Sequence, residues 1–74
     1  MNELTMNLKT DSKVPLYEQI YNYIKSDIQN GRISYGEKLP STRALARHLE
    51  ISRSTAELAY EQLLSEGYIE SEPC

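Results

Sequence analysis

The sequence predicts a mainly α-helical fold with a small β part, built on three helices. Three observations lead to this prediction. Apolar residues recur every three or four positions in three separate segments, the spacing of one helix face. Two of these segments fall within residues 39–69 and are separated by only a few residues. The chain has 74 residues with three glycines and three prolines, which fits one small compact domain better than a disordered tail.

Residues 1–14 are expected to form an arm and a linker ahead of the domain. Residues 3–8 alternate apolar and polar side chains, which predicts a short strand or an extended arm packed on a neighbour. Residues 9–14 are polar and are interpreted as linker. The domain is then expected to cover residues 15–72.

The first helix is expected from Pro15 to about Asn30. Proline suits the first position of a helix, and Gly31 can take the positive φ that ends one. The apolar face repeats every four residues and consists of Leu16, Ile20, Ile24 and Ile28. Residues 33–39 are expected to hold a turn at Tyr35-Gly36 and one β-bridge.

The second helix is expected to begin after Ser41, whose hydroxyl can cap it. It buries one face, formed by Leu45, Ala46 and Leu49. Glu50 occupies the following turn, where the backbone needs a left-handed residue, at a cost of roughly 1 kcal/mol for a residue other than glycine. Ile51 can fill the corner between the helices.

Ser52 is the expected cap of the third helix, which runs from Arg53 to about Glu66 and ends at Gly67. Residues 68–70 are expected to begin a strand. The buried face of this helix consists of Ala56, Ala59, Tyr60 and Leu63, with Tyr60 packed toward Ile20 and Ile24. Four tyrosine rings are expected to border the core with their hydroxyls at the surface, those of Tyr17, Tyr21, Tyr60 and Tyr68.

Charge is unevenly distributed along the chain, although the formal net charge is −3. Half of the eight basic residues lie between positions 38 and 53, a segment with Glu50 as its one acid. They are Lys38, Arg43, Arg47 and Arg53. From Glu57 to Glu72 there are acids and no base. Either one edge of the domain is basic and suited to phosphate, or these are solvated helix faces with random clustering.

Two short helices joined by a tight turn form a helix-turn-helix, a motif that touches DNA base edges with the first turn of its second helix. Arg53, Ser54 and Thr55 occupy that turn. Arginine can bind guanine or phosphate, and hydroxyls and helix-start N–H groups suit phosphate oxygens. The sequence therefore predicts sequence-specific binding to double-stranded DNA.

Residues 15–70, PLYEQIYNYIKSDIQNGRISYGEKLPSTRALARHLEISRSTAELAYEQLLSEGYIE, resemble the N-terminal domain of GntR-type bacterial transcription regulators. The GEKLPSTRALARHL block followed by ISRSTAELAYEQLLSEGYI carries the resemblance, and its wording is most similar to the MocR branch. A YtrA-like regulator is the alternative. The resemblance implies a three-helix winged helix-turn-helix, with a truncated wing in these residues, and a homodimer in the intact protein. In the MocR branch an effector domain that binds pyridoxal phosphate (PLP) would follow; it is absent from this chain, in which no cofactor is expected.

The resemblance also implies which residues meet DNA. Arg43 of the LPSTR block and Ser52, Arg53, Ser54 and Thr55 match the family's contact positions. Some members carry an arginine where this chain has Glu57, so that contact is not carried over. Arg47 and Lys38 are either further phosphate contacts or solvated side chains, and His48 is expected to be a surface residue rather than a ligand. Ser52 is expected to serve first as a cap.

Two other classes of function are alternatives to DNA binding. A winged-helix module that docks proteins would use the acidic segment 57–72. An enzyme is not expected, because the chain has one histidine, a single cysteine at position 74 and no metal-ligand spacing. No apolar run approaches a membrane span and no signal peptide is evident, so a cytoplasmic protein is expected.

Overall fold

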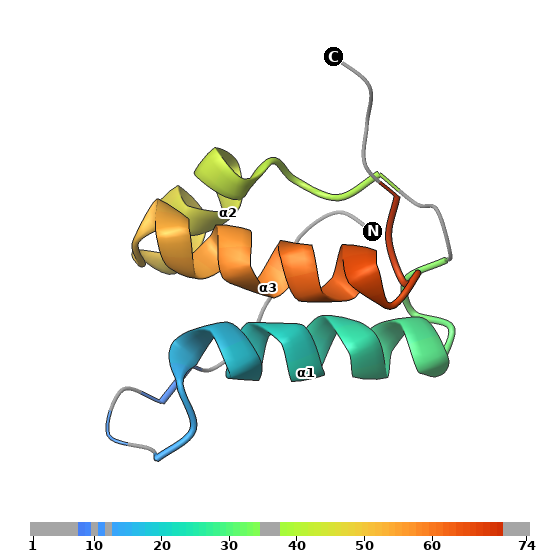
Figure 1. Ribbon diagram of the computed structural model, residues 1–74, viewed down its shortest axis with the longest axis horizontal. Helices are drawn as coiled ribbons and strands as arrows, with labels where there is room; N and C mark the ends of the chain where they lie inside the picture. Colours follow the sequence, from blue (N-terminus) through green and yellow to red (C-terminus); the bar gives the residue numbers. More distant parts are fainter. Residues whose placement is uncertain (1–7, 10, 12, 35–37, 71–74) are drawn as a thin grey trace.

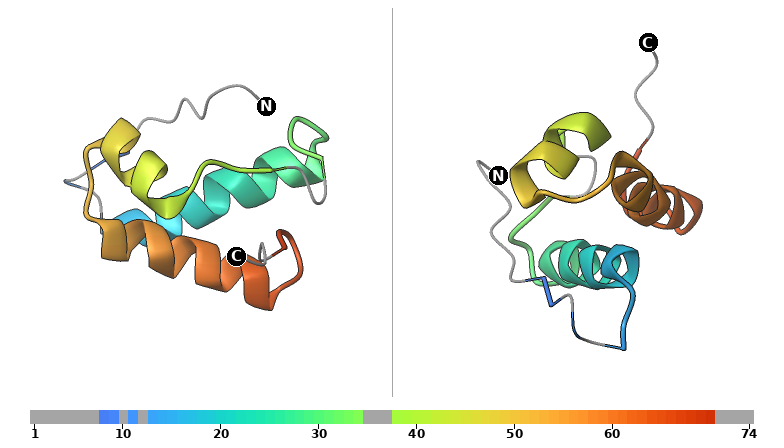
Figure 2. Two further views of the ribbon diagram at one scale, coloured as in Figure 1. Left: turned by 90° about the horizontal axis from the view of Figure 1, so that it is seen from above. Right: turned by 90° about the vertical axis from the view of Figure 1, so that its left-hand side faces the viewer.

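The structure, a computed structural model, describes residues 8, 9, 11, 13–34 and 38–70. It contains three helices, α1 (Leu16–Gln29), α2 (Thr42–Leu49) and α3 (Arg53–Ser65). In Figure 1, α1 and α3 lie one above the other, with α2 beside the first half of α3. Seen from above in Figure 2, α1 and α3 cross at an angle. The third helix packs against both of the others, so it is the centre of the fold.

The core lies where the apolar faces of the three helices meet. This confirms most of the predicted face residues, but Leu16 is only partly buried and lies outside the core. The core is formed by nine buried residues, Ile20, Ile24, Ile28, Ile33, Leu45, Ala46, Ala56, Ala59 and Leu63. Leu49 and Ile51, at the turn between α2 and α3, are partly buried and pack against this core. Burial of these side chains is the main favourable term for a domain with so little other structure.

All three helices end in the same way, with backbone N–H groups donating back to the last turn. In α1 the amide of Gly31 donates to Ile28 and that of Arg32 to Asp27, at 3.2 and 2.9 Å. Gly31 and Gly67 both have φ of 80°, as predicted. The amides of Gly67 and Tyr68 close α3 at 3.1 and 3.0 Å in the same Schellman pattern.

The predicted strand at residues 68–70 is wrong, and no strand or bridge occurs among the described residues. The amide of Tyr68 is already bonded to the carbonyl of Leu63, and an extended segment needs a neighbouring strand to satisfy its other groups. Pro15 lies just outside α1 rather than at its first position, with its carbonyl accepting from Glu18 and Gln19 at 3.1 Å. The predicted features at residues 3–7 and the turn at Tyr35-Gly36 lie outside the described residues.

Part of the predicted linker is fastened to α1 through one glutamine. The Gln19 side chain accepts from the Lys9 amide at 2.8 Å and donates to the Lys9 and Val14 carbonyls at 2.9 and 2.8 Å. Leu8 is partly buried and packs against the core. The segment before α1 is therefore tied to the domain at residues 8 and 9.

Tyr60 borders the core, as predicted, and is only half-buried. Its hydroxyl donates to the carbonyl of Pro40 at 2.7 Å, in the segment that leads into α2. Burial raises the pKa of this hydroxyl to about 12, so it remains a donor at neutral pH. The side chain thus fastens the start of α2 to the middle of α3.

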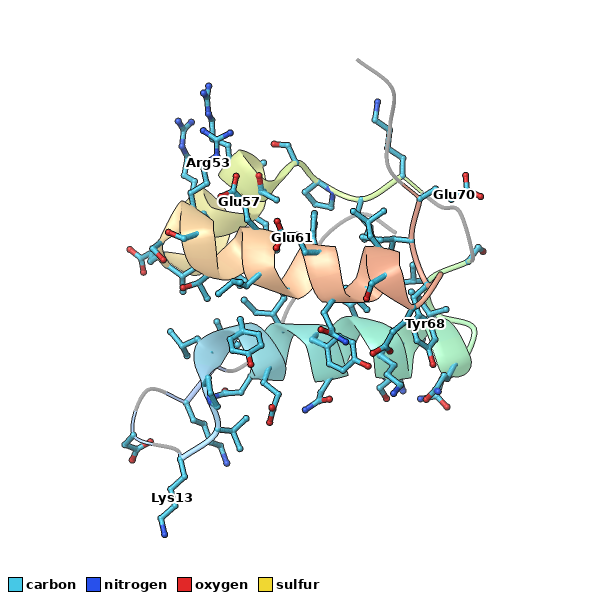
Figure 3. All side chains as sticks on the ribbon, in the orientation of Figure 1. Lys13, Arg53, Glu57, Glu61, Tyr68 and Glu70 are labelled. Carbon is cyan, nitrogen blue, oxygen red and sulfur yellow. The ribbon has the colours of Figure 1, made fainter. Side chains whose placement is uncertain are left out.

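A group of polar and aromatic side chains joins the end of α3 to α1. The Tyr21 hydroxyl donates to one oxygen of Glu66, and Gln62 donates to the other at 2.6 Å. Lys25 donates to the Tyr21 hydroxyl at 3.2 Å, and its Nζ lies 5.3 and 5.6 Å from the ring centres of Tyr21 and Tyr68. Figure 3 shows Tyr68 near the end of α1.

Loss of a buried side chain should cost far more stability than loss of the Tyr60 hydrogen bond. Leu63→Ala is expected to lower the free energy of unfolding by about 2–5 kcal/mol, because Leu63 is fully buried. Tyr60→Phe should cost about 1 kcal/mol, since the Pro40 carbonyl then lacks its partner. Leu64→Ala is the control, because Leu64 is 36% exposed. Urea denaturation of the three variants checks this ranking, and equal midpoints for Leu63→Ala and Leu64→Ala would contradict it.

Stability should fall at acidic pH partly through Glu66. Hydrogen bonds from Tyr21 and then Gln62 lower the pKa of this carboxylate below its ordinary 4.5. A folded-state pKa below the unfolded value stabilises the fold above pH 4.5, and that contribution is lost as pH falls through the folded-state pKa. When the pH is lowered from about 6 to about 3, the melting temperature of Glu66→Gln should therefore fall by less than that of the parent. Glu70→Gln is the matched control, since Glu70 bonds to no described residue; an identical response of both variants would refute the role of Glu66.

Candidate nucleic-acid interface

The site begins at the amino end of α2, which is capped as predicted. The Ser41 hydroxyl accepts from the Ala44 amide at 3.1 Å, and the Ser41 backbone is extended. The cap fixes where the helix starts, and Arg43 therefore falls on its first turn. Arg43 and Arg47 are four residues apart, both exposed, and so lie on one side of α2.

The turn between α2 and α3 depends on Glu50, the one described residue other than glycine with a positive φ. Its φ and ψ are 57° and 47°, the left-handed conformation predicted for it. The amides of Glu50 and Ile51 donate to Arg47 and Ala46 at 3.4 and 3.0 Å. The turn repeats the pattern that ends α1 and α3, without the glycine, and it brings the start of α3 beside the end of α2.

The start of α3 is held by two hydroxyls, confirming Ser52 as the cap. The Ser52 hydroxyl accepts from the Thr55 amide at 3.2 Å and lies 2.7 Å from the Thr55 hydroxyl. Thr55 is half-buried, whereas Ser54 is exposed. Ser52 and Thr55 therefore hold the first turn of α3, while Arg53 and Ser54 point outward from it.

The four basic residues of the segment are all exposed. Among the described residues, no carboxylate forms an ion pair with Lys38, Arg43 or Arg47. Within the described part of the chain, their positive charge is not neutralised by a carboxylate. Within the described part of the chain, Arg43 forms no salt bridge, which is the alternative to a DNA contact for this residue.

Arg53 differs from Lys38, Arg43 and Arg47, because it has a carboxylate partner among the described residues. Its Nε lies 3.5 Å from Oε2 of Glu57, and the two side chains are 58% and 48% exposed. Figure 3 shows Arg53, Glu57 and Glu61 along the same side of α3, with Lys13 on the far side of the molecule below α1. The spacing of four residues could have revealed this pair, since such residues are neighbours on a helix.

Neither metal nor membrane chemistry is indicated by the described residues. No group of three histidine, cysteine, aspartate or glutamate side chains there could hold a metal ion. No helix in the described part of the chain is long and apolar enough to cross a membrane. Exposed basic and hydroxyl side chains lie together on α2 and the first turn of α3.

This arrangement of a short helix, a left-handed turn and a second helix capped by serine defines a helix-turn-helix domain. Residues 16–73 match the family model described as bacterial regulatory proteins, gntR family. The chain belongs to this family, and it is a DNA-binding domain of the type found in GntR-family transcription regulators.

Several individual proteins are similar to the chain. The uncharacterized HTH-type transcriptional regulator YdeL of Bacillus subtilis is 51% identical over 71 residues, which are 96% of this chain and 15% of YdeL. The probable rhizopine catabolism regulatory protein MocR of Rhizobium meliloti is 39% identical over 86% of this chain and 13% of MocR. The structure of YtrA from Sulfolobus acidocaldarius, a GntR-family transcription factor, superposes with a TM-score of 0.84 at 38% identity, covering 89% of this chain and 70% of that one. The chain thus spans only a small part of these two long relatives.

Replacing Glu50 by glycine should stabilise the domain, because glycine adopts the left-handed conformation without the steric cost. We expect a gain of up to about 1 kcal/mol in the free energy of unfolding. Glu50→Ala is the matched control: it removes the same charge but keeps the strain. Thermal melts distinguish the two, and an equal gain for both variants would show that charge rather than backbone conformation limits stability at this turn.

Proposed function

We propose that the chain binds the major groove of a double-stranded DNA operator with the first turn of α3, while α2 lies against the phosphate backbone. The observation that carries the proposal is the exposed basic side of α2, with Arg43 and Arg47 unengaged by any described carboxylate. This surface lies next to a helix start that presents N–H groups and two outward polar side chains. Phosphate contacts from α2 would fix the orientation in which α3 meets the bases.

Each of the seven predicted site residues has a role in this proposal. Arg53 and Ser54 face bases, Arg43 binds a phosphate or guanine, and Arg47 and Lys38 add phosphate contacts. Ser52 and Thr55 act first on the protein, since their hydroxyls already bond to one another and to the helix start. One of the two hydroxyl hydrogens is used in the bond between them, so the other hydroxyl hydrogen can still be donated to a phosphate.

For the intact protein, we propose a cytoplasmic transcription regulator that binds its operator as a homodimer. The domain would occupy residues 15–72 and continue into a wing. YdeL and MocR are several times longer than this chain, which supports a MocR-like protein with a separate effector domain that binds PLP. YtrA supports the alternative of a shorter regulator, because this chain spans 70% of that structure. The chain itself is proposed to have no enzymatic activity.

Replacement of either Arg43 or Arg53 by alanine should weaken binding to a selected duplex by roughly 1–3 kcal/mol. Both side chains are exposed, so the melting temperature should hardly change. Lys13→Ala is the matched control, because it removes the same charge from the opposite side of the molecule. Fluorescence anisotropy across a salt series measures the effect, since binding to phosphates weakens as salt rises. If all three variants bind as the parent does at every salt concentration, α2 and α3 do not form the DNA surface.

A further inference from the structure

The Arg53–Glu57 pair places a negative charge on the helix side that would enter the groove. The Glu57 carboxylate sits at the Nε edge of the guanidinium, with 3.5 Å between Nε and Oε2. Both side chains remain about half exposed, so the pair stands in solvent in the protein alone. A carboxylate here opposes phosphate, and a helix that bound only the DNA backbone would gain nothing from it.

The geometry of the contact suggests what the carboxylate does. A guanidinium can bond a planar partner in two places. One is the edge formed by Nε and one Nη, and the other is the end formed by both Nη groups. The carboxylate occupies the first edge and leaves the end, the fork that bonds guanine O6 and N7. A long arginine side chain loses much rotational freedom on binding. A partner one turn away already restricts the side chain in the free protein, so less freedom is lost when DNA binds.

We propose that Glu57 is a positioning and specificity-determining residue, which holds Arg53 with its Nη fork toward a guanine and disfavours its use as a phosphate clamp. The inference rests on the proposed function. Phosphate attracts net charge, which the pair largely cancels. Guanine instead needs two aligned donors, which the pair preserves. Glu57 thus weakens binding to DNA of any sequence and increases the preference for one base pair.

The exclusion of water in the groove favours the same outcome. In the protein alone the pair is solvent-screened and only weakly held. In a closely packed groove, charges interact more strongly, so Glu57 would stabilise Arg53 most when both are covered by DNA. A guanidinium turned toward phosphate would leave the carboxylate without its partner near a negative backbone, which is costly.

Glu61 supplies the matched control. It lies one turn beyond Glu57 on the same side of α3 and is exposed. Among the described residues it forms no ion pair. Glu61→Gln therefore removes one negative charge from the same helix side without altering Arg53, whereas Glu57→Gln removes the charge and the partner together.

The experiment begins by selecting duplexes from a random library with the 74-residue chain and with Arg53→Ala. The position whose guanine is enriched by the parent and lost in Arg53→Ala identifies the base pair that Arg53 reads. Dissociation constants are then measured for three probes: the selected duplex, the same duplex with that pair changed to A·T, and a scrambled duplex. Circular dichroism melts establish that the variants remain folded.

We expect Glu57→Gln to bind the scrambled duplex more tightly, and to lower the preference for G·C over A·T by about threefold to tenfold, a fraction of a full arginine contact. Glu61→Gln should tighten binding to all three probes by one factor and leave the preference unchanged. In an Arg53→Lys background, Glu57→Gln should no longer change the preference, because lysine has no guanidinium edge to hold.

Three results would overturn the inference. An unchanged preference in Glu57→Gln would mean that the pair does not orient Arg53. A preference lost at a different base pair would mean that Glu57 reads a base directly, as a carboxylate can with a cytosine amino group. A parent chain that enriches no sequence at all would overturn the proposed function and this inference together, which the first step alone reveals.

Discussion

The close approach of α3 to the other two helices is the constraint on which the rest of the structure depends. Ala56 and Ala59 are fully buried on α3, and Leu63 completes the same face. Methyl side chains let helix backbones approach more closely than larger residues would. Since α1 and α2 each pack on α3, the rotation of α3 about its axis decides both the composition of the core and which residues face outward.

The outward face follows from this rotation. With Ala56, Ala59 and Leu63 inside, Arg53, Glu57 and Glu61 line one outer side (Figure 3). Two contacts fix the helix further: the Tyr60 hydroxyl bonds the segment before α2, and Glu66 accepts from Tyr21 of α1. These bonds lie on the two flanks of α3. Hydrogen bonds on both flanks oppose rotation of α3 about its axis and so favour one direction for its outer side chains.

Much of this arrangement could be predicted from the sequence, because it depends on local rules. The predicted and observed helix limits agree to within about a residue, because four-residue apolar spacing and serine caps act within a single turn. The left-handed Glu50 was predictable because the helix-turn-helix demands it at that place. The absence of a strand at residues 68–70 could not be predicted in this way, since a strand forms only with a partner strand elsewhere.

The site shows the same division between local and distant effects. The exposure of Arg43, Arg47 and Arg53 agrees with their predicted role, but the Tyr60–Pro40 bond joins residues twenty positions apart and has no sequence signal. The Arg53–Glu57 pair is different, because its four-residue spacing is a local rule. The sequence indicates repulsion between Glu57 and phosphate, and the same four-residue spacing also indicates its attraction to Arg53.

An acidic chain can still present a DNA-binding surface, because binding depends on local potential rather than on the sum of charges. Here the formal charge is −3, yet Arg43 and Arg47 stand on α2 without a described acidic partner. The acids are placed where they act on the protein itself: Glu66 joins α3 to α1, Glu50 forms the turn and Glu57 meets Arg53. We expect such a surface to bind weakly to any phosphate backbone, since the positive charge of Arg53 is partly neutralised. Weak general binding leaves more of the total affinity to contacts with particular bases, and a regulator that must distinguish one operator from a genome of competing sites benefits from that balance.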